Sequence, residues 1–323
     1  MHPRLSDADR AALRRDGRFV GGLLALVVLC LSCLFDVLLL VLSLCGVLTE
    51  KAFSLPDLGL GYTAYTLLYG GVYIICMGLP VWLCCRLCGR SLRMLVSARP
   101  VRATQTTLTV TTGLGACMLA SMVCSMLETF LQNHGLAQPT PPVLLDGSLP
   151  CFLAAVFTWA LLPAVLEETV FRVCILGSLR KYGDWFAVLI SAVLFGCVHG
   201  GISQSLFAFL IGCVLGYITV STGNVWISVG IHFANNALSV CLQQHTLPLS
   251  AEQAATATAA VLMSVITVGA LSVLCSKRLG VSLFRRVSSM NRSAGDCLRV
   301  LFTSPLLLIG VMLMVMRMIL ILI

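Results

Sequence analysis

Residues 149–172 read LPCFLAAVFTWALLPAVLEETVFR, an apolar run that ends in two glutamates and an arginine. A charged side chain at the centre of a bilayer costs about 2.5–3.5 kcal/mol on insertion scales, so a chain that places Glu167 and Glu168 inside such a run is expected to use them. The composition agrees with a membrane setting: 59% of the 323 residues are hydrophobic, 11% are charged, and the mean hydropathy is +0.99. These values exclude a soluble domain built around one core.

Nine apolar runs are long enough to be membrane spans. They cover residues 19–47, 61–85, 106–131, 149–171, 185–202, 204–221, 225–242, 253–275 and 300–323. The first run is too long for the apolar part of a signal peptide and lacks a small-residue cleavage pattern, which predicts a retained helix. The predicted fold is an all-α polytopic membrane protein with about eight or nine transmembrane helices and a polar site inside the helix bundle.

The distribution of the 21 Lys and Arg residues predicts the orientation. Nearly all lie in four alternate connections: the N-terminal tail up to Arg18, residues 86–102, residues 180–181 and residues 277–299. Because basic loops remain in the cytoplasm, we expect a multi-pass plasma-membrane protein with a cytoplasmic N-terminus. Arg317, in the last run, is expected to snorkel outward. The net charge of +8 then reflects topology and contact with anionic lipid, and no basic stretch interleaves with aromatic residues as nucleic-acid binding would require.

The connector at 132–148 divides the chain. It is rich in proline and contains no Lys or Arg, which is typical of an extracytoplasmic loop here. It separates an N-terminal transmembrane region of unrecognised type, residues 1–148, from a motif-bearing core at 149–245. C-terminal transmembrane helices follow at 246–323.

Two further patterns have structural explanations. Gly212-x-x-x-Gly216 permits a close helix approach, and packing explains it about as well as an active-site role does. Cys85-x-x-Cys88 lies among arginines without a second cysteine pair or a nearby histidine, which argues against a zinc site there.

The two glutamates of the core are expected to differ. Glu168 and Arg172 stand at i and i+4, so they share a helix face and can form an ion pair, whereas Glu167 points elsewhere and stays available. At 1.5 Å per residue, Glu167 and His199 each lie about 20 Å from the same turn near Arg180. The two side chains can therefore meet.

Two more patterns, Phe195-x-x-x-His199 and His232-x-x-x-Asn236, also place their residues on one helix face. A carboxylate beside an imidazole can activate water, and a second imidazole with a carboxamide offers hydrogen-bond donors to an oxyanion. This combination suits amide hydrolysis. Two alternatives stay open from the residues alone: a buried polar network that joins helices, and a zinc site of two histidines and a glutamate, although no H-E-x-x-H pattern is present.

At these residues the sequence resembles the CAAX protease and bacteriocin-processing family, also called the Abi family, of intramembrane glutamate proteases. The matching pieces are LEETVFR at 166–172, FGCVHG at 195–200, FAFLIGCVLGY at 207–217, TGNVW at 222–226 and IHFANN at 231–236. The resemblance covers roughly residues 163–240, about a quarter of the chain.

The resemblance implies a multi-helix membrane fold with the catalytic residues Glu167, His199, His232 and Asn236, supported by Glu168 and Arg172. In it, Glu167 and His199 activate water, while His232 and Asn236 stabilise the oxyanion. The expected activity is that of an endopeptidase that acts, without metal or other cofactor, on a membrane-associated protein or peptide. Because the family also includes members linked to bacteriocin immunity or to scaffolding, the alternative is a noncatalytic protein of the same fold.

Overall fold

The computed structural model describes residues 5–136, 143–284, 287 and 293–322. Part of the predicted connector at 132–148 lies outside these residues, as do four arginines of the predicted cytoplasmic segments: Arg4, Arg285, Arg286 and Arg292. The described secondary structure consists of helices joined by loops, with one isolated β-bridge between Ala98 and Asn224. The prediction of an all-α chain is confirmed.

Seven helices of the described chain are long and apolar enough to cross a membrane. They are α1 (Asp7–Leu44), α2 (Tyr62–Leu87), α4 (Ala103–Asn133), the continuous segment Leu149–Tyr182, α9 (Ile202–Thr222), α10 (Val225–Thr246) and α11 (Ala251–Arg278). Two further helices, α12 (Ala294–Leu301) and α13 (Pro305–Leu322), are bent by 85° at their break and make an eighth span if they are counted together. The chain is a multi-pass membrane protein.

Two of the nine predicted runs differ from the structure. The run at 185–202 was expected to be one span, but α8 (Asp184–His199) has only 16 residues and stops at Gly200. Gly200 has a φ of +82°, a left-handed conformation that glycine adopts at little cost. The run at 300–323 is interrupted before Pro305, which starts α13 because proline suits the first helical turn.

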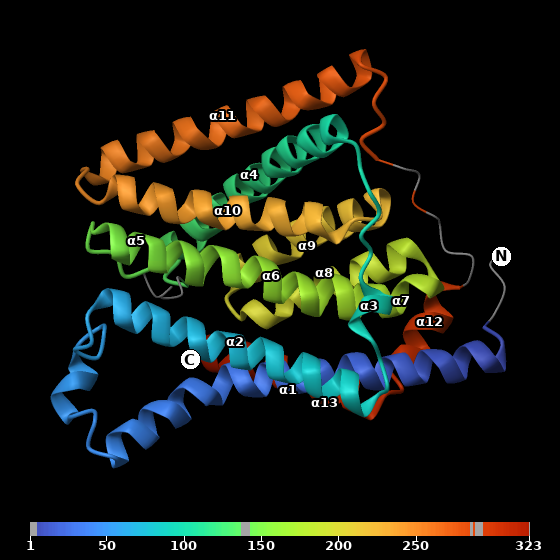
Figure 1. Cartoon of the computed structure of the whole chain (residues 1–323), viewed down its shortest axis with the longest axis horizontal. Helices are drawn as coiled ribbons and strands as arrows, with labels where there is room; N and C mark the ends of the chain where they lie inside the picture. Colours follow the sequence, from blue (N-terminus) through green and yellow to red (C-terminus); the bar gives the residue numbers. More distant parts are fainter. Residues whose placement is uncertain (1–4, 137–142, 285–286, 288–292, 323) are drawn as a thin grey trace.

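The segment Leu149–Tyr182, called the central segment below, carries both glutamates through the middle of the molecule (Figure 1). Its pieces are α5 (Leu149–Ala155), η2 (Val156–Leu161), α6 (Leu162–Glu168), η3 (Thr169–Leu176), α7 (Gly177–Leu179) and η4 (Arg180–Tyr182). Both η2 and η3 are π-helical. The π-helical piece η2 is followed by Pro163, which has no N–H to donate to the preceding turn. A second π-helical piece, η3, follows α6, so widened turns flank the piece that ends in Glu167 and Glu168.

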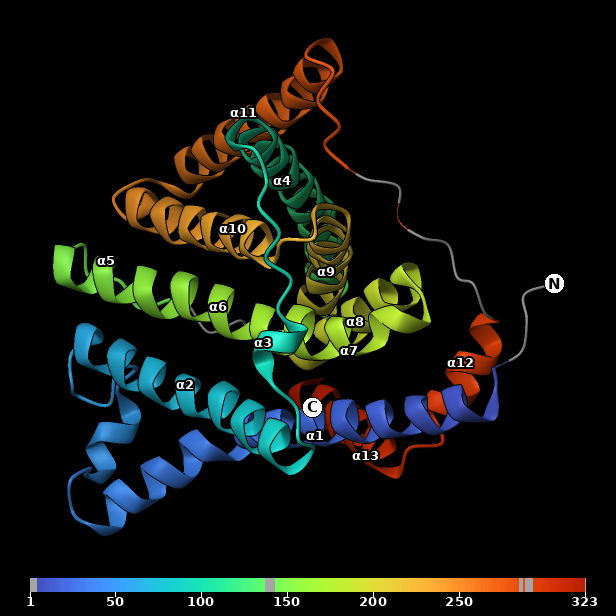
Figure 2. The ribbon, with the colours of Figure 1, turned by 45° about the vertical axis from the view of Figure 1, so that its right-hand side comes forward.

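Two groups of helices enclose the central segment (Figure 2). Helices α1, α2 and α13 lie on one side, and α4, α9, α10 and α11 on the other. In the contact between α8 and α9, a Cβ added at Gly212 would lie 3.0 Å from Ala192 Cα, and one added at Gly216 would lie 3.2 Å from a Val188 methyl. The glycine pair is thus explained by close helix packing.

One end of the bundle gathers three of the predicted cytoplasmic segments around Asp16 of α1. This buried carboxylate pairs with Arg90, which lies between α2 and the short helix α3 (Leu92–Leu95). It also lies 3.0 Å from Lys181 Nζ and accepts a 2.7 Å hydrogen bond from Tyr182 Oη. These contacts place the start of α1, the 86–102 connection and the turn at 180–181 at the same end, as the charge distribution requires.

The C-terminal helix α13 lies alongside α1 in both views. A Cβ at Gly21 of α1 would stand 2.1 Å from the backbone nitrogen of Leu307, whereas one at Gly22 would meet its nearest neighbour, a Leu306 methyl, at 3.7 Å. The two helices therefore approach backbone to backbone at Gly21.

We predict that Gly21→Ala destabilises the protein by about 1–3 kcal/mol, because the added methyl overpacks this contact. Gly22→Ala is the matched control, since its methyl has ordinary space and alanine favours a helix over glycine. Thermal unfolding of both purified variants measures the difference. Equal midpoints for the two variants would contradict the close approach of α1 and α13.

Candidate active site

Glu168, the last residue of α6, is enclosed and holds two basic groups. Arg172 Nη1 lies 3.2 Å from Glu168 Oε1, and His232 Nδ1 of α10 lies 3.0 Å from the same oxygen. The side chains of Glu168 and Arg172 are 0% and 1% exposed. The predicted ion pair at i and i+4 is confirmed, and His232 extends it to a second helix.

Glu167 lies next to Glu168 but has different neighbours. Tyr73 Oη of α2 donates a 2.5 Å hydrogen bond to Glu167 Oε1, and His232 Nε2 lies 3.6 Å from Glu167 Oε2. Because 3.6 Å exceeds hydrogen-bond length, His232 is bound to Glu168 and only faces Glu167. The Glu167 side chain keeps 11% of its surface exposed, so it is the more accessible of the two carboxylates.

His199 ends α8, and its ring meets Phe195. His199 Nδ1 lies 2.8 Å from the Phe195 carbonyl oxygen, which can only accept, so in the neutral ring Nδ1 carries the hydrogen and Nε2 a lone pair. The Phe195 ring lies 4.8 Å from the His199 ring and 6.1 Å from the His232 ring, and the Arg172 guanidinium lies 4.6 Å over it. Phe195 thus brings the three motifs together.

The structure does not show the direct contact that was expected between Glu167 and His199. Across the described residues, no hydrogen bond or ion pair joins these two side chains, and the imidazole that faces Glu167 is that of His232. His232 can reach Glu167 because α10 contacts α6, the piece of the central segment that ends in the two glutamates.

Asn236 lies one turn beyond His232 on α10. Its Oδ1 accepts a 3.0 Å hydrogen bond from Asn235 Nδ2, and its side-chain N–H groups donate to none of the described residues. Asn235 is buried, whereas Asn236 is partly exposed. The donor end of Asn236 is therefore available to another group.

Two side chains near the site were not predicted from the sequence. Tyr73 is one of several tyrosines on α2, and nothing in the sequence singles it out. Arg317 of α13 was expected to snorkel outward, and this is wrong, because its Nη1 donates a 2.7 Å hydrogen bond to the carbonyl oxygen of Val198. The last carbonyls of a helix have no helical partner and attract cations. A lone arginine in an apolar run was the available signal.

The donor geometry bears on the zinc alternative. No group of three His, Cys, Asp or Glu side chains in the described part of the chain is arranged to hold a metal ion. In the candidate site, Glu168 is engaged by Arg172 and by His232 Nδ1.

Residues 149–238 match the family model described as "Type II CAAX prenyl endopeptidase Rce1-like". The resemblance to CAAX proteases is confirmed for this segment. The six residues singled out from the sequence lie within the Rce1-like segment, whereas Tyr73 and Arg317 lie outside it.

Two curated proteins are similar over part of their length. The Bacillus subtilis (strain 168) protein named "Putative membrane peptidase YdiL" is 32% identical over 93 residues, which is 28% of this chain and 38% of the relative. An Escherichia coli protein named "Uncharacterized 24.3 kDa protein" is 25% identical over 133 residues, which is 38% of this chain and 61% of the relative. The chain thus spans less than two thirds of either relative. No solved structure gives a significant match.

We predict that Glu168→Gln destabilises the protein by about 3–5 kcal/mol, because it leaves the Arg172 charge uncompensated in a buried position. Adding Arg172→Met should restore part of the loss, since the double variant contains no unpaired guanidinium. Exposed Glu252→Gln serves as the control. Thermal unfolding provides the measurement, and a Glu168→Gln variant as stable as the control would show that the buried ion pair is absent.

Proposed function

We propose that the chain is an intramembrane endopeptidase that hydrolyses a peptide bond of a membrane-associated protein or peptide. The observation that carries this proposal is the difference in surroundings between two adjacent carboxylates. Glu168 is enclosed by Arg172 and His232, whereas the Glu167 side chain keeps 11% of its surface exposed and is held by Tyr73. A general base must reach water and substrate, which favours Glu167. The Rce1-like match over residues 149–238 supports the same class of reaction.

In the proposed reaction, Glu167 accepts a proton from water as the water oxygen attacks the carbonyl carbon of the substrate. His199 assists, because its Nδ1 hydrogen is bound by the Phe195 carbonyl and its Nε2 keeps a lone pair that can orient water. A new carbon–oxygen bond forms, the carbon–nitrogen bond breaks, and the proton taken from water passes to the leaving amine. No metal takes part.

We assign oxyanion stabilisation to His232 and Asn236. His232 Nε2 lies 3.6 Å from Glu167 Oε2, beyond hydrogen-bond length, and the Asn236 amide nitrogen donates to no described residue. Because His232 Nδ1 donates to the Glu168 carboxylate, Nε2 carries a hydrogen for the oxyanion when the ring is protonated. Both belong to one face of α10, at i and i+4. Donors held in place before the reaction stabilise a developing negative charge without reorganising.

We also propose that the end of the bundle around Asp16 faces the cytoplasm. The basic residues of the tail, of residues 86–102 and of residues 180–181 support this orientation. The turn at Gly223 belongs to the same end, because Gly223 O accepts a hydrogen bond from Arg99 N at 2.9 Å.

We predict that Glu167→Gln abolishes hydrolysis and leaves the protein folded and inserted, because Gln retains the shape of the side chain but cannot act as the base. Comparative proteomics of membranes that contain the wild type or the variant identifies uncleaved substrates, and cleavage of one of them by purified protein measures turnover. Normal turnover by Glu167→Gln would falsify the assignment of the base.

The same assay separates the alternatives. Wild-type turnover should persist in strong chelators, whereas a loss that added zinc restores would indicate a zinc peptidase. A wild type that cleaves nothing in its own membranes would favour the noncatalytic scaffold.

We further predict that Tyr73→Phe lowers kcat about 10- to 100-fold at unchanged KM, because a hydrogen bond to a charged group is worth about 1.5–3 kcal/mol and this one orients the base. Tyr69→Phe is the matched control on α2, since the ring that stacks 4.7 Å from Trp159 is retained. Steady-state kinetics with an identified substrate provides the test. An equal kcat for the two variants would remove Tyr73 from the site.

A further inference from the structure

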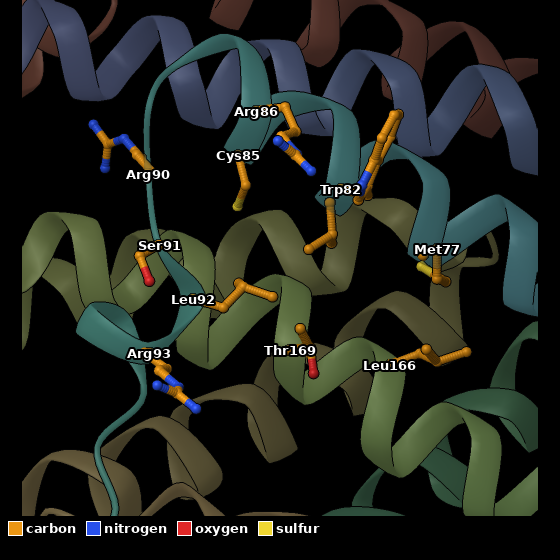
Figure 3. Close-up of a pocket in the computed structure, with 12 residues that line it drawn as sticks. Met77, Trp82, Cys85, Arg86, Arg90, Ser91, Leu92, Arg93, Leu166 and Thr169 are labelled. Atoms are coloured by element: carbon orange, nitrogen blue, oxygen red, sulfur yellow. The ribbon is translucent and has the colours of Figure 1, made fainter.

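A cavity of about 580 Å³ lies between the second half of α2, the connection to α3 and the central segment (Figure 3). This size falls within the usual range for small-molecule sites. The lining side chains are Met77, Val81, Trp82, Cys85, Arg86, Arg90, Ser91, Leu92, Arg93, Leu166 and Thr169, together with Gly78. None of them is acidic. The cavity lies outside the candidate active site but borders the residue that precedes Glu167.

The cavity combines an apolar wall with a cationic rim. Met77 and Val81 of α2 and Leu166 of the central segment form the apolar wall, while Arg86 and Arg93 stand at the end of α2 and on α3. Arg86 lies 6.0 Å over the Trp82 ring. Both arginines are exposed, and no carboxylate of the described chain pairs with either.

The third arginine of the rim is already engaged. Arg90 pairs with Asp16, donates a 2.7 Å hydrogen bond to Ser178 Oγ and lies 4.2 Å over the Phe19 ring. Figure 3 shows it directed away from Arg86 and the apolar wall. Two cations therefore remain for an external partner: Arg86 at the end of α2 and Arg93 on α3.

The order of these groups along α2 matches an amphiphile. At 1.5 Å per residue, Val81 lies about 7.5 Å and Met77 about 13.5 Å deeper in the span than Arg86. Trp82, exposed beside Arg86, is typical of the level where a bilayer meets water. An anionic headgroup at the rim thus places its acyl chain against the apolar wall, and guanidinium groups bind phosphate well.

We propose that this cavity binds one anionic phospholipid, with its headgroup at the cationic rim that Arg86 and Arg93 form and an acyl chain against Met77, Val81 and Leu166. The acyl chain then contacts the two elements that hold Glu167, because α2 supplies Tyr73 and the central segment supplies the carboxylate itself. Binding stabilises the fit between these elements. This lipid site does not depend on the proposed peptidase activity.

The test uses the full purified chain in bilayer nanodiscs of phosphatidylcholine, with or without phosphatidylglycerol as the anionic probe. Lipid retained in native mass spectrometry and the midpoint of thermal unfolding are measured for each variant, so neither readout requires hydrolysis. We expect phosphatidylglycerol to be retained by the wild type and to raise its midpoint.

Arg86→Gln with Arg93→Gln should weaken phosphatidylglycerol binding about 30-fold, the effect of two charges near a membrane surface. The control removes two exposed arginines of the same end that do not line the cavity, Arg102→Gln with Arg278→Gln. Equal losses in the two double variants would overturn the site in favour of general attraction to the membrane surface.

Glycines of α2 test the apolar wall separately. Gly78 lines the cavity and has open space around an added Cβ, so Gly78→Leu should fill the site and abolish the phosphatidylglycerol-dependent rise in midpoint. Gly71→Leu, which also projects into open space but elsewhere on α2, should retain the rise. A full rise in Gly78→Leu would overturn the proposal. A second result would also overturn the proposal: no phosphatidylglycerol is retained, and the Gly78→Leu variant has a higher KM than the wild type in pure phosphatidylcholine. That result would mean that the cavity binds substrate.

Discussion

Burial of charge inside the helix bundle is the constraint on which the rest of the structure depends. Glu168 and Arg172 are shielded from solvent, and an isolated charge in such a place is far more costly than a paired one. Two carboxylates and one guanidinium sum to −1 with neutral His232, and to zero when His232 is protonated. The pairing therefore requires α10 to pack against α6 in one orientation, so the stability of the fold and the geometry of the site have the same cause.

This constraint also explains why parts of the chain outside the Rce1-like segment belong to the site. Glu168 binds Arg172 and His232 Nδ1, so neither of these groups is bound to Glu167. Oε1 of Glu167 instead accepts a hydrogen bond from Tyr73 of α2. The carbonyl of Val198, at the end of the short helix α8, is bound by Arg317 from α13. Helices near both ends of the chain thus hold the two elements that carry Glu167 and His199.

The sequence predicted the helices well because hydropathy and length largely determine a membrane span, and it predicted the Glu168–Arg172 pair because i and i+4 residues share a face on a single helix. It failed where the answer depended on how one helix is rotated against another. His232 faces Glu167 because of the way α10 packs against α6. Tyr73 donates its hydrogen bond to Glu167 because of the position of α2. Pro305 and Gly200 can be read from the sequence as residues that end or begin a helix. The hydropathy of the residues around them is continuous, so each run was predicted as one unbroken span.

The asymmetry between the two glutamates is what turns a structural cluster into a candidate catalyst. A network that only joined helices would gain from pairing both carboxylates with basic groups, as Oε1 of Glu168 is paired with Arg172 and His232. Glu167 instead keeps part of its surface open, with one neutral donor and an imidazole nitrogen beyond bonding distance. Its neighbours hold its position without neutralising it, which is what a base needs before substrate arrives. The buried pair of Glu168 and Arg172 holds the helices in place, and the adjacent carboxylate of Glu167 stays available to react.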